Sequence, residues 1–304
     1  METFLDLWAA YGSTVTFAMV NALFALSTYA VLSTGVLSFT TVVFAAVGGF
    51  LAAQLSGKFG LPLWAAFPAA ALGGGFAAAV VAFAFLRLES HWMALASLAL
   101  VLITRVTALN APALTGGVNG LIVPVRVEPL ELAILLALCT VVFWRLHRSW
   151  FGLASRAVRE DAAVASTMGI SPYRIQFIAF LISGVVGGLG GAALAFTLQF
   201  ISPETYFIGI AFTMIASTVL GGSFHWLGPI IGAAVFTALP TTMQAIVPQI
   251  EDVAKGVVLL LIMIFLPRGL IDPRAWGLKK AARLRQKIHD ETEAKRAAER
   301  DAHA

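Results

Sequence analysis

The sequence is poor in charge and in cysteine for a chain of its length. Of its 304 residues, 12% are charged and 59% are hydrophobic, and the mean hydropathy is +0.88. A soluble domain carries about twice that proportion of charge. The single cysteine, Cys139, excludes an internal disulfide and argues against a cysteine-type metal site, so we predict no metal site. The chain is therefore expected to lie largely in lipid.

Motifs for catalysis are also missing. The five histidines stand apart from one another, and none is grouped with an acid and a nucleophile. No glycine-rich phosphate loop ends in lysine and serine or threonine, so the chain is not expected to hydrolyse ATP by itself. The net charge of +4 lies mainly in loops and near the C-terminus, which suits orientation in a membrane better than nucleic-acid binding. We predict no enzyme activity, catalytic residue, cofactor or nucleic-acid partner.

Long apolar segments dominate the chain. A helix needs about 20 apolar residues to cross the hydrocarbon layer, and the sequence lacks the alternating pattern of barrel strands. We therefore predict an all-α, polytopic membrane protein with about nine transmembrane helices in a permease domain over residues 1–272. A charged tail follows at 273–304. The nine apolar segments are Trp8 to Leu32, Gly35 to Leu55, Leu61 to Leu86, Trp92 to Leu109, Leu130 to Leu146, Ile175 to Phe200, Thr205 to Leu220, Leu227 to Val247 and Val253 to Leu266.

Basic residues predict the orientation of these segments. They gather between Arg145 and Arg174 and again from Arg268 to Arg300, which places both regions in the cytoplasm. Four apolar segments separate the two regions, and an even number of spans returns the chain to the same side of the membrane. An odd total then places the N-terminus and the loop 110–128 outside, and the C-terminus inside. The tail is either solvated or rests on anionic membrane lipid through its basic residues.

Glycine is abundant within the apolar segments and allows two interpretations. Small residues four apart let helices pack closely in lipid. Alternatively, glycines break helices at mid-membrane and expose backbone groups to a polar solute. The stretch from Gly35 to Gly49 is the first place to look for a break, because Ser38, Thr40 and Thr41 add hydroxyls there.

The loop over about residues 147–174 is the most informative part of the sequence. Its alanine-rich residues from Asp161 to Met168 predict a short helix outside the membrane, which ends at Gly169 before Ser171 and Pro172. A short helix held between two spans suits docking to a partner. An ordinary charged loop is the other interpretation.

This loop resembles that of the branched-chain amino acid ABC-importer permeases of the LivM/LivH type. The matching residues are Gly152, Arg156, Ala157, Arg159, Glu160, Asp161, Met168, Gly169 and Ile170. Thr115 to Leu121 resembles an outer loop of the LivM branch, to which the chain is closer. Further matches are Ile201 to Glu204, Val219 to Ser223, Gly228 to Ala233 and Phe265 to Leu270.

The resemblance implies a permease subunit of an ATP-binding-cassette importer in the bacterial inner membrane. Its partners would be a second permease subunit in a heterodimer, two cytoplasmic ATPase subunits and an extracytoplasmic solute-binding protein. A coupling helix from Ser155 to Gly169 would dock on the ATPase. The coupling loop residues would be Gly152, Arg156, Arg159, Glu160, Asp161, Met168 and Gly169, and the pathway residues Ser38, Thr40, Thr41 and Asn119.

The solute and the mechanism stay open at this point. Where the family usually has Leu-Ser-Leu-Gly-His-Ala, this chain has Leu-Ser-Phe-Thr-Thr-Val at 37–42. Branched-chain or other small amino acids, amides and urea are all possible solutes. The alternatives in function are a secondary transporter or channel that needs no ATPase, and a membrane scaffold that binds the ATPase but moves nothing.

Overall fold

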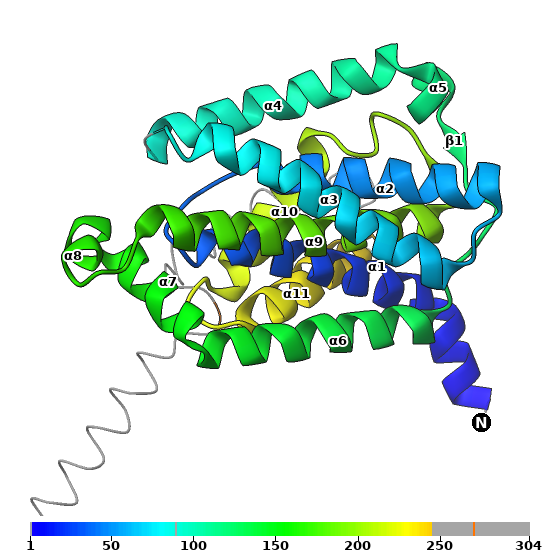
Figure 1. The fold of residues 1–304 in the computed structure, drawn as a ribbon. Helices are drawn as coiled ribbons and strands as arrows, with labels where there is room; N and C mark the ends of the chain where they lie inside the picture. Colours follow the sequence, from blue (N-terminus) through cyan, green and yellow to red (C-terminus); the bar gives the residue numbers. More distant parts are fainter. Residues whose placement is uncertain (1, 89, 245–269, 271–304) are drawn as a thin grey trace, which may run out of the picture.

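The structure, a computed structural model, is helical along most of its length (Figure 1). It describes residues 2–88, 90–244 and 270, so the predicted ninth span, the tail and the C-terminal orientation lie outside the described residues. The elements are α1 (Glu2–Leu32), α2 (Thr40–Phe59), α3 (Leu63–Phe85), α4 (Ser90–Asn110), α5 (Pro112–Thr115), η1 (Gly117–Asn119), β1 (Leu121–Ile122), α6 (Pro129–Arg148), α7 (Trp150–Glu160), α8 (Ala162–Thr167), α9 (Pro172–Leu198), β2 (Phe200–Ile201), α10 (Ile208–Gly221) and α11 (Leu227–Gln244).

Six helices within the described part are long and apolar enough to cross a membrane. They are Gly12–Leu32, Thr40–Phe59, Leu63–Phe85, Trp92–Asn110, Pro129–Arg148 and Pro172–Leu198. Two shorter apolar helices follow, Ile208–Gly221 and Leu227–Ala238. The all-α, polytopic prediction agrees with these helices, whereas the count of nine stays a prediction because Val253 to Leu266 is not described.

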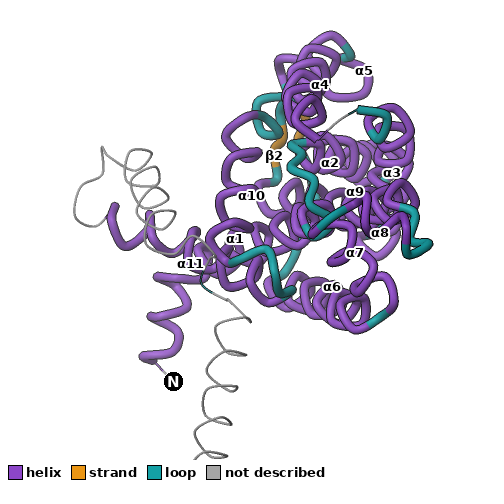
Figure 2. Tube along the Cα trace, turned by 90° about the vertical axis from the view of Figure 1, so that its left-hand side faces the viewer, coloured by secondary structure: helices purple, strands orange, loops and turns teal. Residues whose placement is uncertain are grey.

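The helix α9 lies at the centre of the bundle and packs against α1, α2 and α3 (Figure 2). Glycine makes this packing possible. A Cβ atom added to Gly48 of α2 would lie 2.4 Å from the Cα atom of Gly188, and one on Gly188 would lie 2.3 Å from the carbonyl oxygen of Ala70. Both α2 and α9 continue as helices through these glycines. The structure therefore shows close packing here, and not a mid-membrane break.

The predicted second span begins later than its apolar pattern suggests. Gly35 has φ +85°, which only glycine adopts easily, and the chain turns there. Ser38 then accepts a hydrogen bond from the backbone N–H of Thr40 at 3.2 Å, a local bond that favours a turn over a helix. The helix α2 accordingly starts at Thr40, so the prediction of a span from Gly35 is wrong by about one turn.

The connections gather at the two ends of the bundle. The N-terminus of α1, α5 and β1 lie at one end, whereas α7, α8 and the α3–α4 connection lie at the other (Figure 1). At the first end β1 and β2 pair antiparallel, with Leu121 opposite Ile201. The order of the predicted spans likewise places the N-terminus and the loop 110–128 on one side of the membrane and the loop 147–174 on the other.

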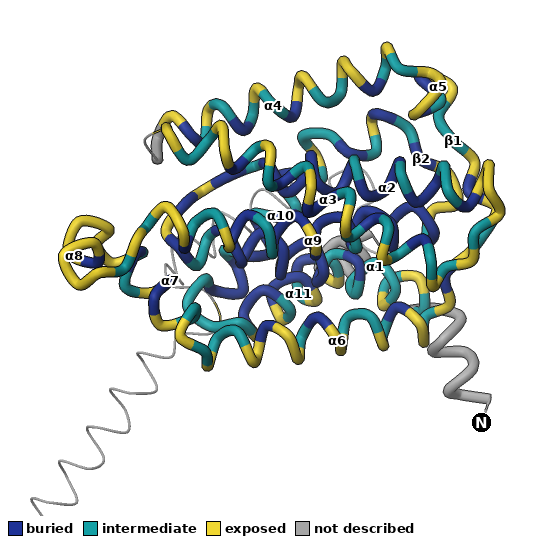
Figure 3. Tube along the Cα trace, viewed as in Figure 1, coloured by how far each residue is buried: buried dark blue, intermediate teal, exposed yellow. Residues whose placement is uncertain are grey.

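The outer surfaces of the bundle are apolar. Large side chains of α3, α4 and α6 face outward, and Figure 3 shows exposed positions along each of these helices. Examples are Trp64, Leu72, Phe76, Leu95, Ile134 and Leu138. So large an exposed apolar surface is typical of helices that face lipid, because in water it would drive aggregation.

Candidate functional site

The loop between α6 and α9 forms two short helices at one end of the bundle. The prediction of one continuous helix from Ser155 to Gly169 is wrong, because Asp161 takes an extended conformation (φ −158°, ψ 111°) between α7 and α8. Its Oδ1 atom accepts hydrogen bonds from the backbone N–H groups of Ala163 at 2.8 Å and Val164 at 3.0 Å. Asp161 therefore caps the N-terminus of α8, whose first N–H groups have no partner within the helix.

Two glycines shape this pair of helices. Gly169, which follows the C-cap residue Met168 of α8, has φ +79°. The Ile170 N–H donates to the carbonyl oxygen of Ala165 at 3.1 Å, which completes a glycine-based helix end. A Cβ atom on Gly152 would lie 2.5 Å from the carbonyl oxygen of His147. Gly152 thus lets α7 pack directly on the last turn of α6.

A small apolar cluster joins α7, α8 and the start of α9. Its buried members are Ala154, Val158, Ala165 and Ile175. Val164 of α8 and Met168, which follows the last residue of α8, are 51% and 75% exposed. The loop is therefore a packed structure with an exposed apolar outer face.

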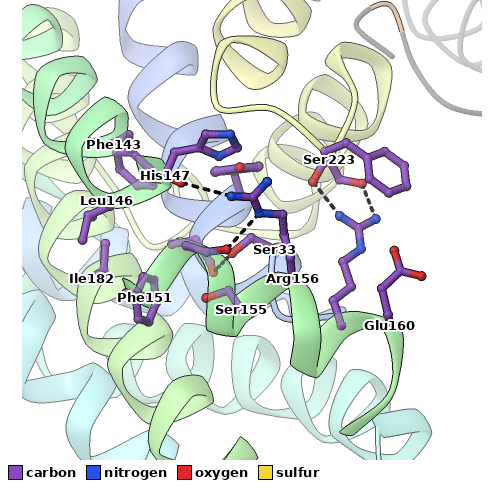
Figure 4. Close-up of a pocket in the computed structure, with 15 residues that line it drawn as sticks. Ser33, Phe143, Leu146, His147, Phe151, Ser155, Arg156, Glu160, Ile182 and Ser223 are labelled. Carbon is purple, nitrogen blue, oxygen red and sulfur yellow. Dashed lines mark hydrogen bonds between the residues drawn. The ribbon is translucent and has the colours of Figure 1, made fainter. Parts of the chain in front are cut away.

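The two arginines of the loop are engaged within the chain (Figure 4). The Arg156 guanidinium donates from Nε to the carbonyl oxygen of Gly152 at 3.0 Å and from Nη2 to that of His147 at 3.3 Å. The Arg159 guanidinium donates to the carbonyl oxygen of Ser223 at 2.6 Å and to its hydroxyl at 2.7 Å. It also lies 4.2 Å from the ring centre of Phe224. These arginines connect α7 to α6 and to the α10–α11 connection.

A cavity of about 360 Å³ lies on the inner side of α7. Ser155, Arg156, Arg159 and Glu160 contribute polar groups to it. Its apolar wall comes from Phe143, Leu146, Phe151 and Ile182. Ser155 is only 2% exposed, and its hydroxyl has no hydrogen-bond partner within the described part of the chain. The remaining lining residues are Tyr29, Ala30, Ser33, His147, Gly152, Ser223 and Phe224.

His225 stands beside this cavity, in the α10–α11 connection. Its ring centre is 5.1 Å from that of His147 and 5.5 Å from that of Trp226. Burial, together with the nearby Arg156 charge, lowers the pKa of His225 below its ordinary value. The imidazole is therefore neutral at neutral pH.

The predicted pathway residues do not come together. Ser38 and Thr40 share a hydrogen bond of 2.9 Å at the start of α2, and Thr41 is buried in its first turn. Asn119 lies exposed in η1, beyond the other end of α2. A helix of 20 residues separates these positions by about 30 Å. Ser38, Thr40 and Thr41 lie instead at the α7 end, where Gly35 packs on Arg159.

Sequence reasoning missed the partners of the loop. Ser223 is the last residue of the matched motif Val219 to Ser223, but nothing in its spacing indicated that it would bind Arg159. At the other end of the bundle, Arg105 of α4 forms an ion pair with Glu204, which lies 99 positions away in the chain. Among residues 12–88, 92–238 and 270, no group of three or more His, Cys, Asp or Glu is arranged to hold a metal ion.

The chain is similar to known membrane permeases. A family model described as "Branched-chain amino acid transport system / permease component" matches residues 11–266. The high-affinity branched-chain amino acid transport system permease protein LivM of Salmonella typhimurium is 28% identical over 263 residues, which cover 75% of this chain and 62% of that protein. The chain thus spans less than two thirds of this relative.

Shorter matches extend to permeases named for other solutes. The guanosine ABC transporter permease protein NupQ of Bacillus subtilis is 33% identical over 39% of this chain and 37% of its own length. The autoinducer 2 import system permease protein LsrC of Photorhabdus laumondii is 29% identical over 43% and 42%. No solved structure shows a significant match. Because the family model covers most of the helical bundle, the chain belongs to the family of branched-chain amino acid transport system permease components.

Proposed function

We propose that the chain is the transmembrane permease subunit of an ATP-binding-cassette importer in the bacterial inner membrane. The observation that carries this proposal is the packed α7–α8 loop, which lies at one end of the bundle between two spans of a permease-family fold. The proposed partners are a second permease subunit, two cytoplasmic ATPase subunits and an extracytoplasmic solute-binding protein. The α7–α8 end then faces the cytoplasm, as its basic residues indicate.

The contacts of the loop suggest how ATP-driven movement reaches the spans. The exposed apolar face of α8, with Val164 and Met168, is the surface that would dock on the ATPase. Arg156 and Arg159 act inside the permease, because their guanidinium groups bind α6 and the α10–α11 connection. A push on α8 would therefore move α7 and, through Arg159, the connection that holds Ser223.

The solute is a small polar molecule in this proposal. Branched-chain or other small amino acids, amides and urea fit the sequence, and the relatives named for guanosine and autoinducer 2 widen the choice. Ser38, Thr40 and Thr41 are the proposed pathway residues, since they place hydroxyls at the cytoplasmic end of α2. Asn119 is proposed at the outer entrance.

Uptake by reconstituted vesicles tests the proposal. The vesicles would hold this chain, its partner permease and the ATPase, with the binding protein added. Uptake of each candidate solute would be measured for the wild-type chain and for the variant Val164→Glu in α8. A charge on this face should lower ATP-dependent uptake at least about tenfold, because an unpaired charge in an apolar contact costs more than 1.4 kcal/mol.

The matched control is Val118→Glu, a charge placed at a more exposed valine on the opposite end of the bundle. It should leave docking to the ATPase unchanged. Uptake that proceeds without the ATPase would contradict the proposal in favour of a secondary transporter or channel. An intact complex that binds the ATPase and transports none of the solutes would favour a scaffold.

A further inference from the structure

The cavity beside α7 contains a buried hydroxyl without a partner. Ser155 is 2% exposed, and its Oγ atom makes no hydrogen bond within the described part of the chain. Leaving a buried hydroxyl unpaired is unfavourable. Because Ser155 lines the cavity, a molecule in the cavity can supply the missing partner.

Arg156 offers further hydrogen-bond donors at the same place. A guanidinium has five N–H groups, and Arg156 uses one on Nε and one on Nη2 for its bonds to the chain. Both N–H groups of Nη1 and the second N–H group of Nη2 have no hydrogen-bond partner among the described residues. They can form the paired donor geometry that a carboxylate accepts with both oxygens.

The charges around the cavity favour an anion. The lining includes the two cations Arg156 and Arg159 and the single carboxylate Glu160, and His225 beside it is neutral. In the view of Figure 4, Glu160 lies on the Ser223 side, whereas Ser155 and Arg156 lie nearer the apolar side chains. A negative group at Ser155 and Arg156 would therefore meet positive charge first.

The apolar part of the lining selects for an apolar group. Phe143, Leu146, Phe151 and Ile182 form it, so a ligand held by its charged end at Arg156 would place its other end against hydrocarbon. The volume of about 360 Å³ lies within the range of small-molecule sites, about 300–1,000 Å³.

We propose that this cavity is a binding site for a small organic carboxylate with a compact apolar chain, held by Arg156 and Ser155. The location of the site on the cytoplasmic side rests on the proposed function. Two sources share this chemistry: a transported solute that leaves through the α7 end, and a separate cytoplasmic carboxylate that controls transport.

Calorimetric titration of the full chain in lipid nanodiscs tests the site without any ATPase. The probe is 4-methylpentanoate, and its neutral counterpart 4-methylpentanamide has nearly the same shape. The carboxylate should bind at least about tenfold more tightly than the amide, since a charge-assisted hydrogen bond is worth about that factor. Empty nanodiscs measure partition into lipid. Equal affinity for the two compounds overturns the proposal.

Two variants assign the binding to these residues. Arg156→Gln should weaken 4-methylpentanoate binding about tenfold, whereas Arg148→Gln, a neighbouring arginine that does not line the cavity, should leave it unchanged. Ser155→Ala should weaken binding severalfold and also raise the unfolding temperature of the ligand-free protein, because it removes the unpaired hydroxyl. A serine with a purely structural role would not be expected to give weaker binding together with a higher unfolding temperature. Unchanged binding in both Arg156→Gln and Ser155→Ala overturns the proposal.

Transport assays separate the two sources. ATP-dependent entry of labelled 4-methylpentanoate into vesicles supports the transported solute, whereas slower solute uptake when the carboxylate is present only on the ATPase side supports a separate regulator. Either result supports the site. If binding is intact but no ATP-dependent uptake of any solute occurs, the proposed function fails and the carboxylate site stands.

Discussion

Arg159 of α7 binds Ser223 of the α10–α11 connection through two hydrogen bonds, of 2.6 Å to its carbonyl oxygen and 2.7 Å to its hydroxyl. The two residues are 64 positions apart in the chain. The planar guanidinium makes both bonds at once while it lies over the ring of Phe224. This contact fixes α7 to a part of the bundle that is remote in sequence.

We predict that Arg159→Lys uncouples ATP hydrolysis from transport. Lysine keeps the charge but cannot form the paired bonds or the ring contact, so α7 would move without Ser223. In the reconstituted complex, ATP hydrolysis should continue while solute uptake falls about tenfold, consistent with losing about 1.4 kcal/mol of coupling. Arg148→Lys serves as the control, because Arg148 packs over Trp144 and not on Ser223. A parallel loss of hydrolysis and uptake would contradict this role.

We predict that Gly188→Ala destabilises the bundle strongly. The added methyl group would meet the backbone of α3 at 2.3 Å, and inserting volume into a close contact costs about 1–3 kcal/mol, with more expected against backbone. The unfolding temperature in detergent should therefore fall by several degrees. Gly209→Ala in α10 is the matched control, because its methyl group would meet no atom within 4 Å. Similar unfolding temperatures for the two variants would argue against the packing of α9 described above.

Asp161→Ala should loosen α8 without disturbing the spans. The variant removes the acceptor of the Ala163 and Val164 N–H groups, and loss of such a cap costs about 1 kcal/mol. Hydrogen exchange at these two amides should become several times faster. Asp161→Asn keeps a capping oxygen and should exchange nearly as slowly as the wild type. Equal acceleration in both variants would indicate that the charge matters and the cap does not.

The lowered pKa of His225 predicts a loss of stability in acid. The unfolded chain binds a proton at this histidine below about pH 6.5, whereas the folded chain resists it because of burial and Arg156. The folded state is therefore fully favoured above about pH 6.5 and loses stability as the pH falls through the lower folded pKa. His225→Asn should show a smaller drop in unfolding temperature between pH 7.5 and pH 5.5.

The substitution leaves a side-chain acceptor near the Leu227 N–H, which His225 binds at 3.2 Å. Between pH 8.5 and pH 7.5 the histidine does not titrate, so the two proteins should change in parallel over that range. The same acid-side drop in both proteins would show that another group is responsible. His147 is the neighbour to examine in that case.

Local patterns in the sequence were sufficient for much of the fold. Runs of apolar residues predicted the six long helices, and close packing was one of the two interpretations that the glycines allowed. The short helix ending at Gly169 was also predicted, because alanine favours a helix and glycine accepts a positive φ. These features depend on residues close together in the chain.

The errors arise where local bonds or distant contacts decide the structure. Apolar residues from Gly35 onward suggested a helix, but the turn at Gly35 and the Ser38 hydrogen bond delay its start to Thr40. The cap that the Asp161 carboxylate provides for α8 was not predicted, and its contact with the ATPase stays a prediction. Sequence alone also did not show that Ser38, Thr40 and Thr41 lie at one end of α2 and Asn119 beyond the other, because it does not show which ends of the helices meet.

The sequence by itself determined that this is a helical membrane protein of the permease family, because lipid requires long apolar helices and small residues where they pack. Only the tertiary structure decided that Arg156 and Arg159 bind other segments of the chain, and that Ser155 is buried beside a cavity with an apolar wall. The direction of a side chain depends on which helices pack around it. Such packing joins residues far apart in the chain, and no local pattern records it.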